Sequence, residues 1–329
     1  MNSDLRIVYM GTPDFAVEPL RQLLDNNYNV VAVVTMPDKA IGRHHETLQS
    51  SPVKKFAIER GLPVLQPEKL KDEAFLEELR SYKADLQIVV AFRMLPEVVW
   101  AMPPMGTFNL HTALLPQYRG AAPMNWAIIN GDKETGVTTF FLDHDIDTGR
   151  IIMQARTPIH EEDNVEDIHD RLMMMGSELV IKTVRAIEDG TAESVPQEQF
   201  MTDEPLRHAP KIFKETCLID WTAGLENVYN FVRGLSPYPA AWTQLVGEEG
   251  KVQDVKVYKV HKETASQEDE EIASRQLVGS VVTDGKSLKV RVDGGYIVID
   301  ELQVAGKKRM ATADFLRGAR IAEGTRVKM

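Results

Sequence analysis

Three side chains between residues 109 and 149 have the types and spacing of an acid–base site. Asn109 and His111 stand two residues apart at the end of the apolar run TFNLH, and on a strand such side chains point to the same face. Asn supplies an uncharged N–H donor, and His donates or accepts a proton near neutral pH. Asp147 could hold or relay the imidazole proton. Such a set can stabilise the oxyanion of a tetrahedral intermediate and deprotonate an attacking amine, as acyl-type transfer requires.

The segment directly after His111 favours a site over a chance arrangement. An Asn-x-His pair with a distant Asp occurs in many chains, and a histidine at a strand end is more often structural than catalytic. Here the run LLPQYRGAAP, residues 114–123, combines prolines, glycine and alanines into a rigid irregular loop. The sites of α/β sheets lie in loops at strand ends.

The first half of the chain alternates strand and helix. Apolar runs predict strands at 5–10, 29–35, 62–66 and 85–92, and helical spacing predicts helices at 16–27, 51–61, 67–83 and 164–190. This rhythm is typical of a parallel, Rossmann-like sheet. Gly11-Thr-Pro13 does not match G-x-G-x-x-G, so the sequence does not indicate a dinucleotide site. Residues 36–54 are non-periodic, and loops of that length in a compact domain are usually functional or disordered.

The second half changes character. Residues 191–210 are polar and interrupted by proline, which predicts a linker, and short β-rich runs separated by glycine and charged turns follow it. Several short strands of this kind predict a small barrel. The expected organisation is a catalytic domain at 1–190, a linker at 191–210 and a barrel domain at 211–329, which suits a chain of 329 residues. Residues 264–275 are expected to form an exposed acidic excursion from the barrel.

Charge is distributed unevenly along this acidic chain. The formal net charge is −11, with 20 Lys and Arg against 32 Asp and Glu in residues 1–210, but 18 against 17 in residues 211–329. Seven cations oppose two carboxylates in the last 24 residues. A local basic face is therefore possible on an acidic protein, and contact with phosphates depends on local potential. A solvated charged tail would give the same composition.

The remaining composition points to the cytosol. The one cysteine, Cys217, excludes an internal disulfide, and the polar start MNSDLRIVYM does not read as a signal peptide. No apolar run approaches the roughly 20 residues that cross a bilayer.

Asn109-Leu-His111, the following LLPQYRGAAP and Asp147-Thr-Gly149 together resemble the folate-dependent formyltransferases, whose shared triad is Asn, His and Asp. Further matching segments keep the family's order along nearly the whole chain: MGTPDFAV (10–17), SPVKKFA (51–57), PVLQP (63–67), HAPKI (208–212), IDW (219–221) and ELQVAGKKRM (301–310). The resemblance implies a Rossmann-like formyltransferase domain with a parallel sheet, followed by a small OB-like β-barrel. It also implies 10-formyltetrahydrofolate as formyl donor and no metal.

The same resemblance implies a reaction and its substrates. The expected reaction moves a formyl group to the α-amino group of methionine on initiator tRNA, with Asn109, His111 and Asp147 as the catalytic residues. The strand end at 89–99 resembles the place where these enzymes hold the pteridine ring, a flat amide-like heterocycle that backbone groups can bind. The expected folate-binding residues are Arg93, Met94, Leu95, Ala113, Leu114, Leu115 and Pro116.

Five basic residues are the expected tRNA contacts. Arg43 matches the family arginine in the long loop that approaches the tRNA acceptor end, although His44, His45 and Glu46 replace the lysines that commonly follow it. The other four are Lys211 at the linker exit and Lys307, Lys308 and Arg309 in the terminal domain.

Two other interpretations remain open from the sequence. One is an enzyme of the same superfamily that acts on another amine, such as glycinamide ribonucleotide or an amino sugar nucleotide; the segments around IDW and AGKKRM disfavour it. The other is a catalytically silent RNA-binding protein with two domains, against which the intact Asn109, His111 and Asp147 argue.

Overall fold

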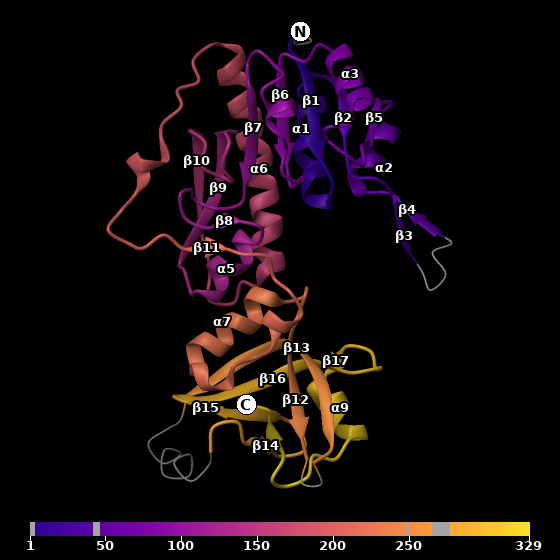
Figure 1. The fold of residues 1–329 in the computed structure, drawn as a ribbon. Helices are drawn as coiled ribbons and strands as arrows, with labels where there is room; N and C mark the ends of the chain where they lie inside the picture. Colours follow the sequence, from indigo (N-terminus) through magenta and orange to yellow (C-terminus); the bar gives the residue numbers. More distant parts are fainter. Residues whose placement is uncertain (1–3, 42–46, 248–249, 265–276) are drawn as a thin grey trace. The chain divides into compact units, whose positions relative to one another are not determined.

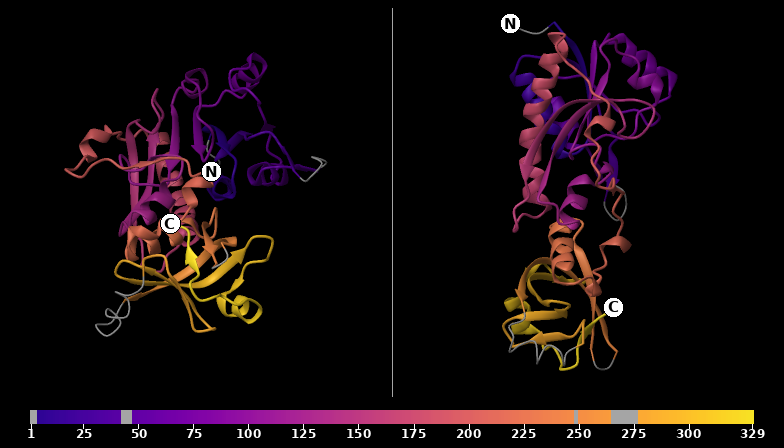
Figure 2. Two further views of the ribbon diagram at one scale, coloured as in Figure 1. Left: turned by 60° about the horizontal axis from the view of Figure 1, so that its bottom comes forward. Right: turned by 90° about the vertical axis from the view of Figure 1, so that its left-hand side faces the viewer.

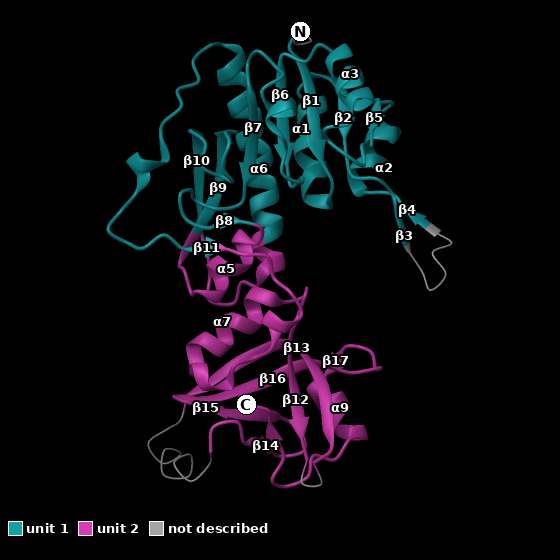
Figure 3. Ribbon diagram, viewed as in Figure 1, with its two compact units in different colours: residues 1–120, 135–157, 169–208 teal, residues 121–134, 158–168, 209–329 magenta. Residues whose placement is uncertain are grey.

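The chain packs into two compact units. The structure, a computed structural model, describes residues 4–41, 47–247, 250–264 and 277–329. Unit 1 comprises residues 1–120, 135–157 and 169–208, and unit 2 comprises residues 121–134, 158–168 and 209–329 (Figure 3). Unit 2 therefore includes two short segments that interrupt unit 1 along the chain. The expected domain boundaries at residues 190 and 211 stay a prediction.

A seven-stranded sheet in the order β10-β9-β7-β6-β1-β2-β5 forms the centre of unit 1 (Figure 1). Its strands are β1 (Arg6–Gly11), β2 (Asn29–Val34), β5 (Val64–Leu65), β6 (Leu86–Val90), β7 (Thr107–His111), β9 (Glu134–Phe141) and β10 (Ile151–Pro158). The pairs β1–β2, β1–β6, β2–β5 and β6–β7 are all parallel, which confirms the predicted parallel sheet. β9 departs from it and runs antiparallel to β7. Strand direction of this kind is a tertiary outcome that hydrophobic periodicity does not encode.

Helices cover both faces of this sheet. The helices and helical turns are η1 (Asp14–Ala16), α1 (Val17–Asp25), α2 (Pro52–Glu59), α3 (Glu73–Ser81), α4 (Glu97–Trp100), α6 (Val165–Glu188) and η2 (Gln197–Phe200). α3 buries Leu76 and Leu79 against Val8 of β1. On the opposite face, α6 packs so closely on β7 that a Cβ at Gly176 would lie 2.8 Å from Leu110 Cδ2. All five residues of β6 are consequently buried, as expected for a strand covered on both sides.

The long segment after β2 contains a small hairpin that the sequence did not predict. Strands β3 (Lys39–Ile41) and β4 (Thr47–Gln49) pair antiparallel with each other and stand apart from the main sheet (Figure 1). Three residues are too few to show a period, so the sequence pattern missed both strands. Lys54 Nζ binds Asp38 Oδ2 at 2.6 Å, and Gln66 donates to both Met36 O and Asp38. Hydrogen bonds from Lys54 and Gln66 lower the pKa of Asp38, so its carboxylate is well suited to hold the base of the hairpin.

Unit 2 is built around an antiparallel barrel. Its sheet has the order β14-β15-β16-β13-β12-β18, with β17 paired to β16, and an isolated antiparallel bridge between Ser280 and Arg326 joins the two ends of that order (Figure 2). This closure confirms the predicted small barrel. The strands are β12 (Ala241–Val246), β13 (Val252–Thr264), β14 (Val281–Thr283), β15 (Leu288–Val292), β16 (Gly295–Val304), β17 (Met310–Ala311) and β18 (Arg326–Val327). The remaining elements of the chain are β8 (Arg119–Gly120), α5 (Pro123–Ile129), β11 (His208–Ala209), η3 (Glu215–Cys217), η4 (Trp221–Ala223), α7 (Leu225–Leu235) and α9 (Thr312–Gly318).

α7 joins the barrel core to the earlier segments of unit 2. Val228 and Val232 belong to the same buried cluster as the barrel strands, and Arg233 is itself buried. Its guanidinium donates to the carbonyls of His160 and Asp163, while Asn125 Nδ2 donates to Gly234 O. These bonds explain why residues 121–134 and 158–168 pack with unit 2. Within the described ranges, no helix combines the length and the apolar character needed to cross a bilayer.

Candidate active site at the carboxyl end of the unit 1 sheet

Asn109 and His111 lie on one face of β7, as the two-residue spacing predicts. The strand covers Thr107–His111, runs parallel to β6 and faces β9 on its other side, so both side chains stand at the carboxyl end of a central strand. His111 is 6 % exposed, and its ring meets Phe140 edge-on at a centroid distance of 6.4 Å. The side chain of half-buried Asn109 forms no hydrogen bond with the described part of the chain. Its amide is therefore available to a ligand.

The two nitrogens of His111 have different environments. Nε2 lies 2.9 Å from the carbonyl oxygen of Tyr118, which only accepts, so Nε2 carries a hydrogen and donates it. The neutral ring then has its lone pair on Nδ1, which lies 3.9 Å from Asp147 Oδ2. That separation is too long for a hydrogen bond. The Asp147 carboxylate thus faces the ring nitrogen that Tyr118 does not engage.

Asp147 is held in place by a hydrogen bond from a different segment of the chain. Its Oδ2 accepts the backbone N–H of Gly120 at 2.9 Å, and its backbone has φ 57°, a left-handed conformation unusual for a residue with a side chain. Asp143 stabilises the turn that leads to Asp147, since its Oδ1 accepts from the Thr148 hydroxyl at 2.7 Å and from Asp145 N at 3.2 Å. The structure thus brings the three residues predicted as catalytic into one site on unit 1.

Two residues of this site were missed by the sequence reasoning. Tyr118 fixes the tautomer of His111 through its backbone carbonyl, which leaves no signature in its side-chain type. Gln197 is 1 % exposed, and its amide donates to Asp147 O and Gly149 O. It lies in the segment predicted as a linker, so its position along the chain gave no reason to connect it with Asp147.

The predicted folate segment 93–95 follows β6 and has an unengaged backbone. No hydrogen bond within the described ranges uses the backbone N–H or C=O groups of these three residues. The side chain of Met94 is 74 % exposed, whereas Leu95 is buried in the cluster below α3. The guanidinium of Arg93 donates to the carbonyls of Pro67 and Glu68, and burial lowers its pKa. Arg93 therefore anchors the neighbouring loop through its side chain and leaves its backbone free.

In the second predicted folate segment, 113–116, most backbone groups already form hydrogen bonds within the protein. Thr138 Oγ1 donates to Ala113 O and accepts from Leu115 N, and Gln154 donates to Leu115 O. The carbonyl of Leu114 accepts from Gln117 N. Ala113 and Leu115 are at most 1 % exposed. These residues shape the site wall, and few of their backbone groups remain for a ligand.

A further polar group points to the same edge of the sheet. Thr12 follows β1, the strand beside β6, and its Oγ1 is buried with no hydrogen-bond partner in the described chain. β1 and β6 are adjacent strands whose connections leave toward opposite sides of the sheet, and ligands of open α/β sheets bind at such switch points.

The predicted tRNA contacts fall into different surroundings. Arg43 lies outside the described residues. Lys211 is exposed in unit 2 and its ammonium lies 5.4 Å from the ring centroid of Phe213. Lys307 and Lys308 are exposed in the turn between β16 and β17. Arg309 pairs with Glu301, and its guanidinium lies 4.5 Å from the ring centroid of Tyr258, so this side chain is already engaged.

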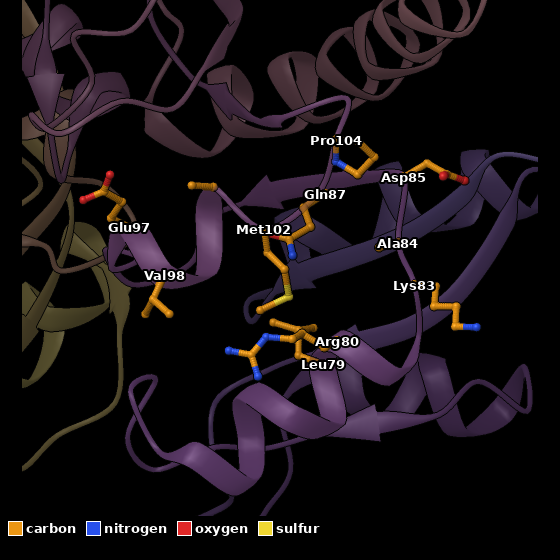
Figure 4. A pocket seen from close by; sticks show the side chains of 11 residues that line it. Leu79, Arg80, Lys83, Ala84, Asp85, Gln87, Glu97, Val98, Met102 and Pro104 are labelled. Carbon is orange, nitrogen blue, oxygen red and sulfur yellow. The ribbon is translucent and has the colours of Figure 1, made fainter.

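A separate hollow of about 700 Å³ in unit 1 contains none of the predicted site residues. Figure 4 shows it beside α3 and α4, with Arg80 and Lys83 on one side and Glu97 and Met102 on the other. It reaches Asp85 at the amino end of β6, whereas His111 is the last residue of β7 at the opposite end of the sheet. Among the described residues, no three His, Cys, Asp or Glu side chains gather closely enough to hold a metal ion.

Comparison with known proteins identifies relatives of the whole chain. Residues 5–184 match the family model for formyl transferase, and residues 211–320 match that for the formyl transferase C-terminal domain. The chain is 62 % identical over 325 residues to methionyl-tRNA formyltransferase of Parabacteroides distasonis, covering 98 % of each chain. It is 59 % identical over 322 residues to methionyl-tRNA formyltransferase of Bacteroides thetaiotaomicron, again with 98 % of each covered.

Solved structures share the fold. HypX from Aquifex aeolicus in complex with tetrahydrofolic acid matches with a TM-score of 0.63 at 18 % identity, over 95 % of this chain and 47 % of that one. The N-formyltransferase from Helicobacter canadensis, bound to folinic acid and dTDP-3-aminofucose, also gives 0.63 at 18 % identity, over 93 % and 100 %.

Proposed function

Because the chain belongs to the formyl transferase family, we propose that it transfers a formyl group from 10-formyltetrahydrofolate to the α-amino group of methionine on initiator tRNA. The products are formylmethionyl-tRNA, used to initiate translation, and tetrahydrofolate. The observation that carries this proposal is identity of 62 % along nearly the whole length of a relative named for this reaction. The assembled Asn109, His111 and Asp147 support it chemically, since they form a site able to move an acyl group to an amine.

The proposed mechanism follows from the positions of these three groups. The neutral amine attacks the formyl carbon, a new C–N bond forms, and a negative charge develops on the formyl oxygen. The Asn109 amide and the His111 ring donate to this oxyanion, which is the kind of stabilisation that lowers acyl-transfer barriers most. Collapse of the intermediate breaks the bond from carbon to the folate N10, and the proton lost by the amine ends on N10.

The environment of His111 defines how it takes part. Because Nε2 keeps its hydrogen for Tyr118 O, the ring can donate to the oxyanion only through a protonated Nδ1, that is, as an imidazolium. Asp147 lies 3.9 Å from that nitrogen, and its carboxylate attracts the positive ring. We assign to Asp147 the steering of the amine proton toward N10 through a water molecule.

The folate assignment uses the free backbone groups of residues 93–95. A pteridine ring presents adjacent donors and acceptors, so an unengaged strand end can bind it without dedicated side chains. Residues 113–116 contribute a buried wall and less hydrogen bonding, because Thr138 and Gln154 already bind them.

The tRNA assignment uses Arg43, Lys211, Lys307 and Lys308, with Arg309 as a paired neighbour. We further propose that the chain acts as a cytoplasmic monomer without a membrane partner. Its expected parts are a catalytic domain at 1–190, a linker at 191–210 and a tRNA-binding domain at 211–329.

The test is incubation of the purified protein with methionyl-tRNA and formyl-labelled 10-formyltetrahydrofolate. Labelled formylmethionine recovered from the tRNA is the expected product. Glycinamide ribonucleotide and an amino sugar nucleotide serve as competing acceptors. Transfer to either of these with none to methionyl-tRNA would overturn the proposed substrate, and no transfer at all would overturn the proposed reaction.

A further inference from the structure

Gln197 connects the segment after α6 to the loop that carries Asp147. Its Nε2 donates to Asp147 O at 2.8 Å and to Gly149 O at 2.9 Å, and its Oε1 accepts from Arg119 Nε and Nη2 at 3.0 and 2.6 Å. Carbonyl oxygens only accept and a guanidinium only donates, so the partners fix the orientation of this amide. With a side chain only 1 % exposed, Gln197 is a buried polar group whose hydrogen-bonding capacity is completely used.

These bonds close a ring around Asp147. The Asp147 carbonyl binds Gln197, Gln197 binds the Arg119 side chain, and the next residue, Gly120, donates its N–H back to Asp147 Oδ2 at 2.9 Å. The segment 119–120 thus holds the carboxylate of Asp147, and Gln197 holds its backbone carbonyl. Because Asp147 has a left-handed backbone, which is unfavourable for a residue with a side chain, its conformation depends on such surrounding contacts.

The same segment also holds the partner of His111. Arg207 O accepts the N–H of Tyr118 at 2.7 Å, and Arg207 Nη1 donates to the Tyr118 hydroxyl at 3.1 Å. Tyr118 in turn accepts the Nε2 hydrogen of His111. Residues 197–207 therefore contact both loops that set the separation of Nδ1 and the carboxylate.

We infer that Gln197, together with Arg119, is a positioning residue that holds Asp147 at its place opposite His111 Nδ1. The inference rests on the proposed function, because it assigns to Gln197 the alignment of the proposed proton transfer. Gln197 touches neither reacting atom in this arrangement and acts through Asp147. Misplacement of a catalytic group by about 1 Å can cost on the order of 100-fold in rate, so its loss should appear in turnover.

The test compares Gln197→Met with Gln199→Met. Methionine has similar length but does not hydrogen-bond Asp147, Gly149 or Arg119, and Gln199 is an exposed residue of the same helical turn. We expect Gln197→Met to lower kcat by about 10- to 100-fold. The KM values for methionyl-tRNA and folate should stay within about twofold, because binding groups are untouched. Gln199→Met should behave as the parent.

A double-mutant cycle with Asp147→Asn separates positioning from general stability. If Gln197 acts through Asp147, Gln197→Met should change kcat by less than about twofold once Asp147 is already Asn. Equal losses in both backgrounds would overturn the inference, as would parent-like kcat in Gln197→Met. If Gln197→Met does not fold, Gln197→Glu replaces it, since Glu keeps the acceptors for Arg119 and removes both donors to the Asp147 loop. The kcat of Gln197→Glu, measured alone and together with Asp147→Asn, then tests the inference by the same two comparisons.

Failure of the inference is distinguishable from failure of the proposed function. The parent protein is assayed first with methionyl-tRNA, and its activity depends on the proposed function alone. An active parent whose Gln197 variants keep full turnover refutes the positioning role and leaves the function standing.

Discussion

His111 and Asp147 form an asymmetric pair. A directly bonded imidazole and carboxylate would hold a proton between them, but here the Tyr118 carbonyl binds Nε2 and the carboxylate stands 3.9 Å from Nδ1. Nδ1 therefore has no direct hydrogen bond to the carboxylate, and in the proposed mechanism it is the atom that meets the substrate oxygen. The arrangement therefore suits a ring that donates to a developing oxyanion while its neighbour directs a proton elsewhere.

Replacement of Asn109 or His111 by alanine should lower turnover by about two to three orders of magnitude, the usual effect of losing one oxyanion donor or acid–base group. The two variants should differ in stability. Asn109→Ala removes no internal hydrogen bond of the described chain, whereas His111→Ala removes the Nε2 donor to the buried Tyr118 carbonyl, at about 1–3 kcal/mol. Single-turnover formylation and thermal unfolding measure the two effects. Near-parent turnover in a folded His111→Ala protein would remove His111 from the mechanism.

Asp147→Asn separates charge from shape. An asparagine can keep its oxygen toward Gly120 N–H, so the loop retains its anchor while the negative charge is lost. We expect kcat to fall by about 100-fold, within the range for loss of a proton-transfer group, with methionyl-tRNA affinity unchanged. The measurement is kcat and KM beside an equilibrium binding assay. A large loss of tRNA affinity with normal single-turnover chemistry would contradict this role.

At the scale of the elements, hydrophobic periodicity predicted the helices and strands whose pattern is visible within a short stretch of sequence. The same-face placement of Asn109 and His111 follows from strand alternation. The alternation of apolar strands and amphipathic helices predicted a parallel sheet, although not the order of its strands. Periodicity did not predict the antiparallel direction of β9 or the β3–β4 hairpin, because the direction and pairing of strands depend on residues that are distant in sequence. The role of Gln197 in the site was not predicted for the same reason: this residue binds Asp147 from 50 residues away in the sequence.

Folate binding should slow amide hydrogen exchange in the segment that follows β6. A folate analogue without the formyl group should slow exchange at the amides of residues 93–95, which are unengaged in the free protein. Leu115 N already donates to Thr138 Oγ1, so exchange at that amide should change much less. The comparison of the two segments, with and without analogue, is an internal control. Binding shown independently, with no protection at residues 93–95, would move the pteridine site elsewhere.

At the scale of the whole molecule, the acidic total hides a charge difference along the chain. Residues 1–210 have twelve more carboxylates than cations, and residues 211–329 have one more cation than carboxylates. A polyanion is therefore expected to meet its attractive potential at local basic sites of the second half. For phosphate binding, the number of cations without an acidic partner matters more than the total number of cations. Arg309, which pairs with Glu301, is an example of a cation that is already engaged.

Lys307 and Lys308 are the cations of the terminal group GKKR that are expected to contact tRNA phosphates. The double variant Lys307→Ala/Lys308→Ala should raise the KM for methionyl-tRNA and leave the KM for folate almost unchanged. Each lost phosphate contact should flatten the slope of log affinity against log salt by about 0.9 unit or less, because fewer counterions are released on binding. Arg309→Ala is the comparison variant from the same turn: Glu301 and Tyr258 already engage its guanidinium, so we expect it to change the salt slope less. If the double variant binds methionyl-tRNA as tightly as the parent at every salt concentration, this turn is only a solvated face. The phosphate attraction would then depend on Arg43 and Lys211.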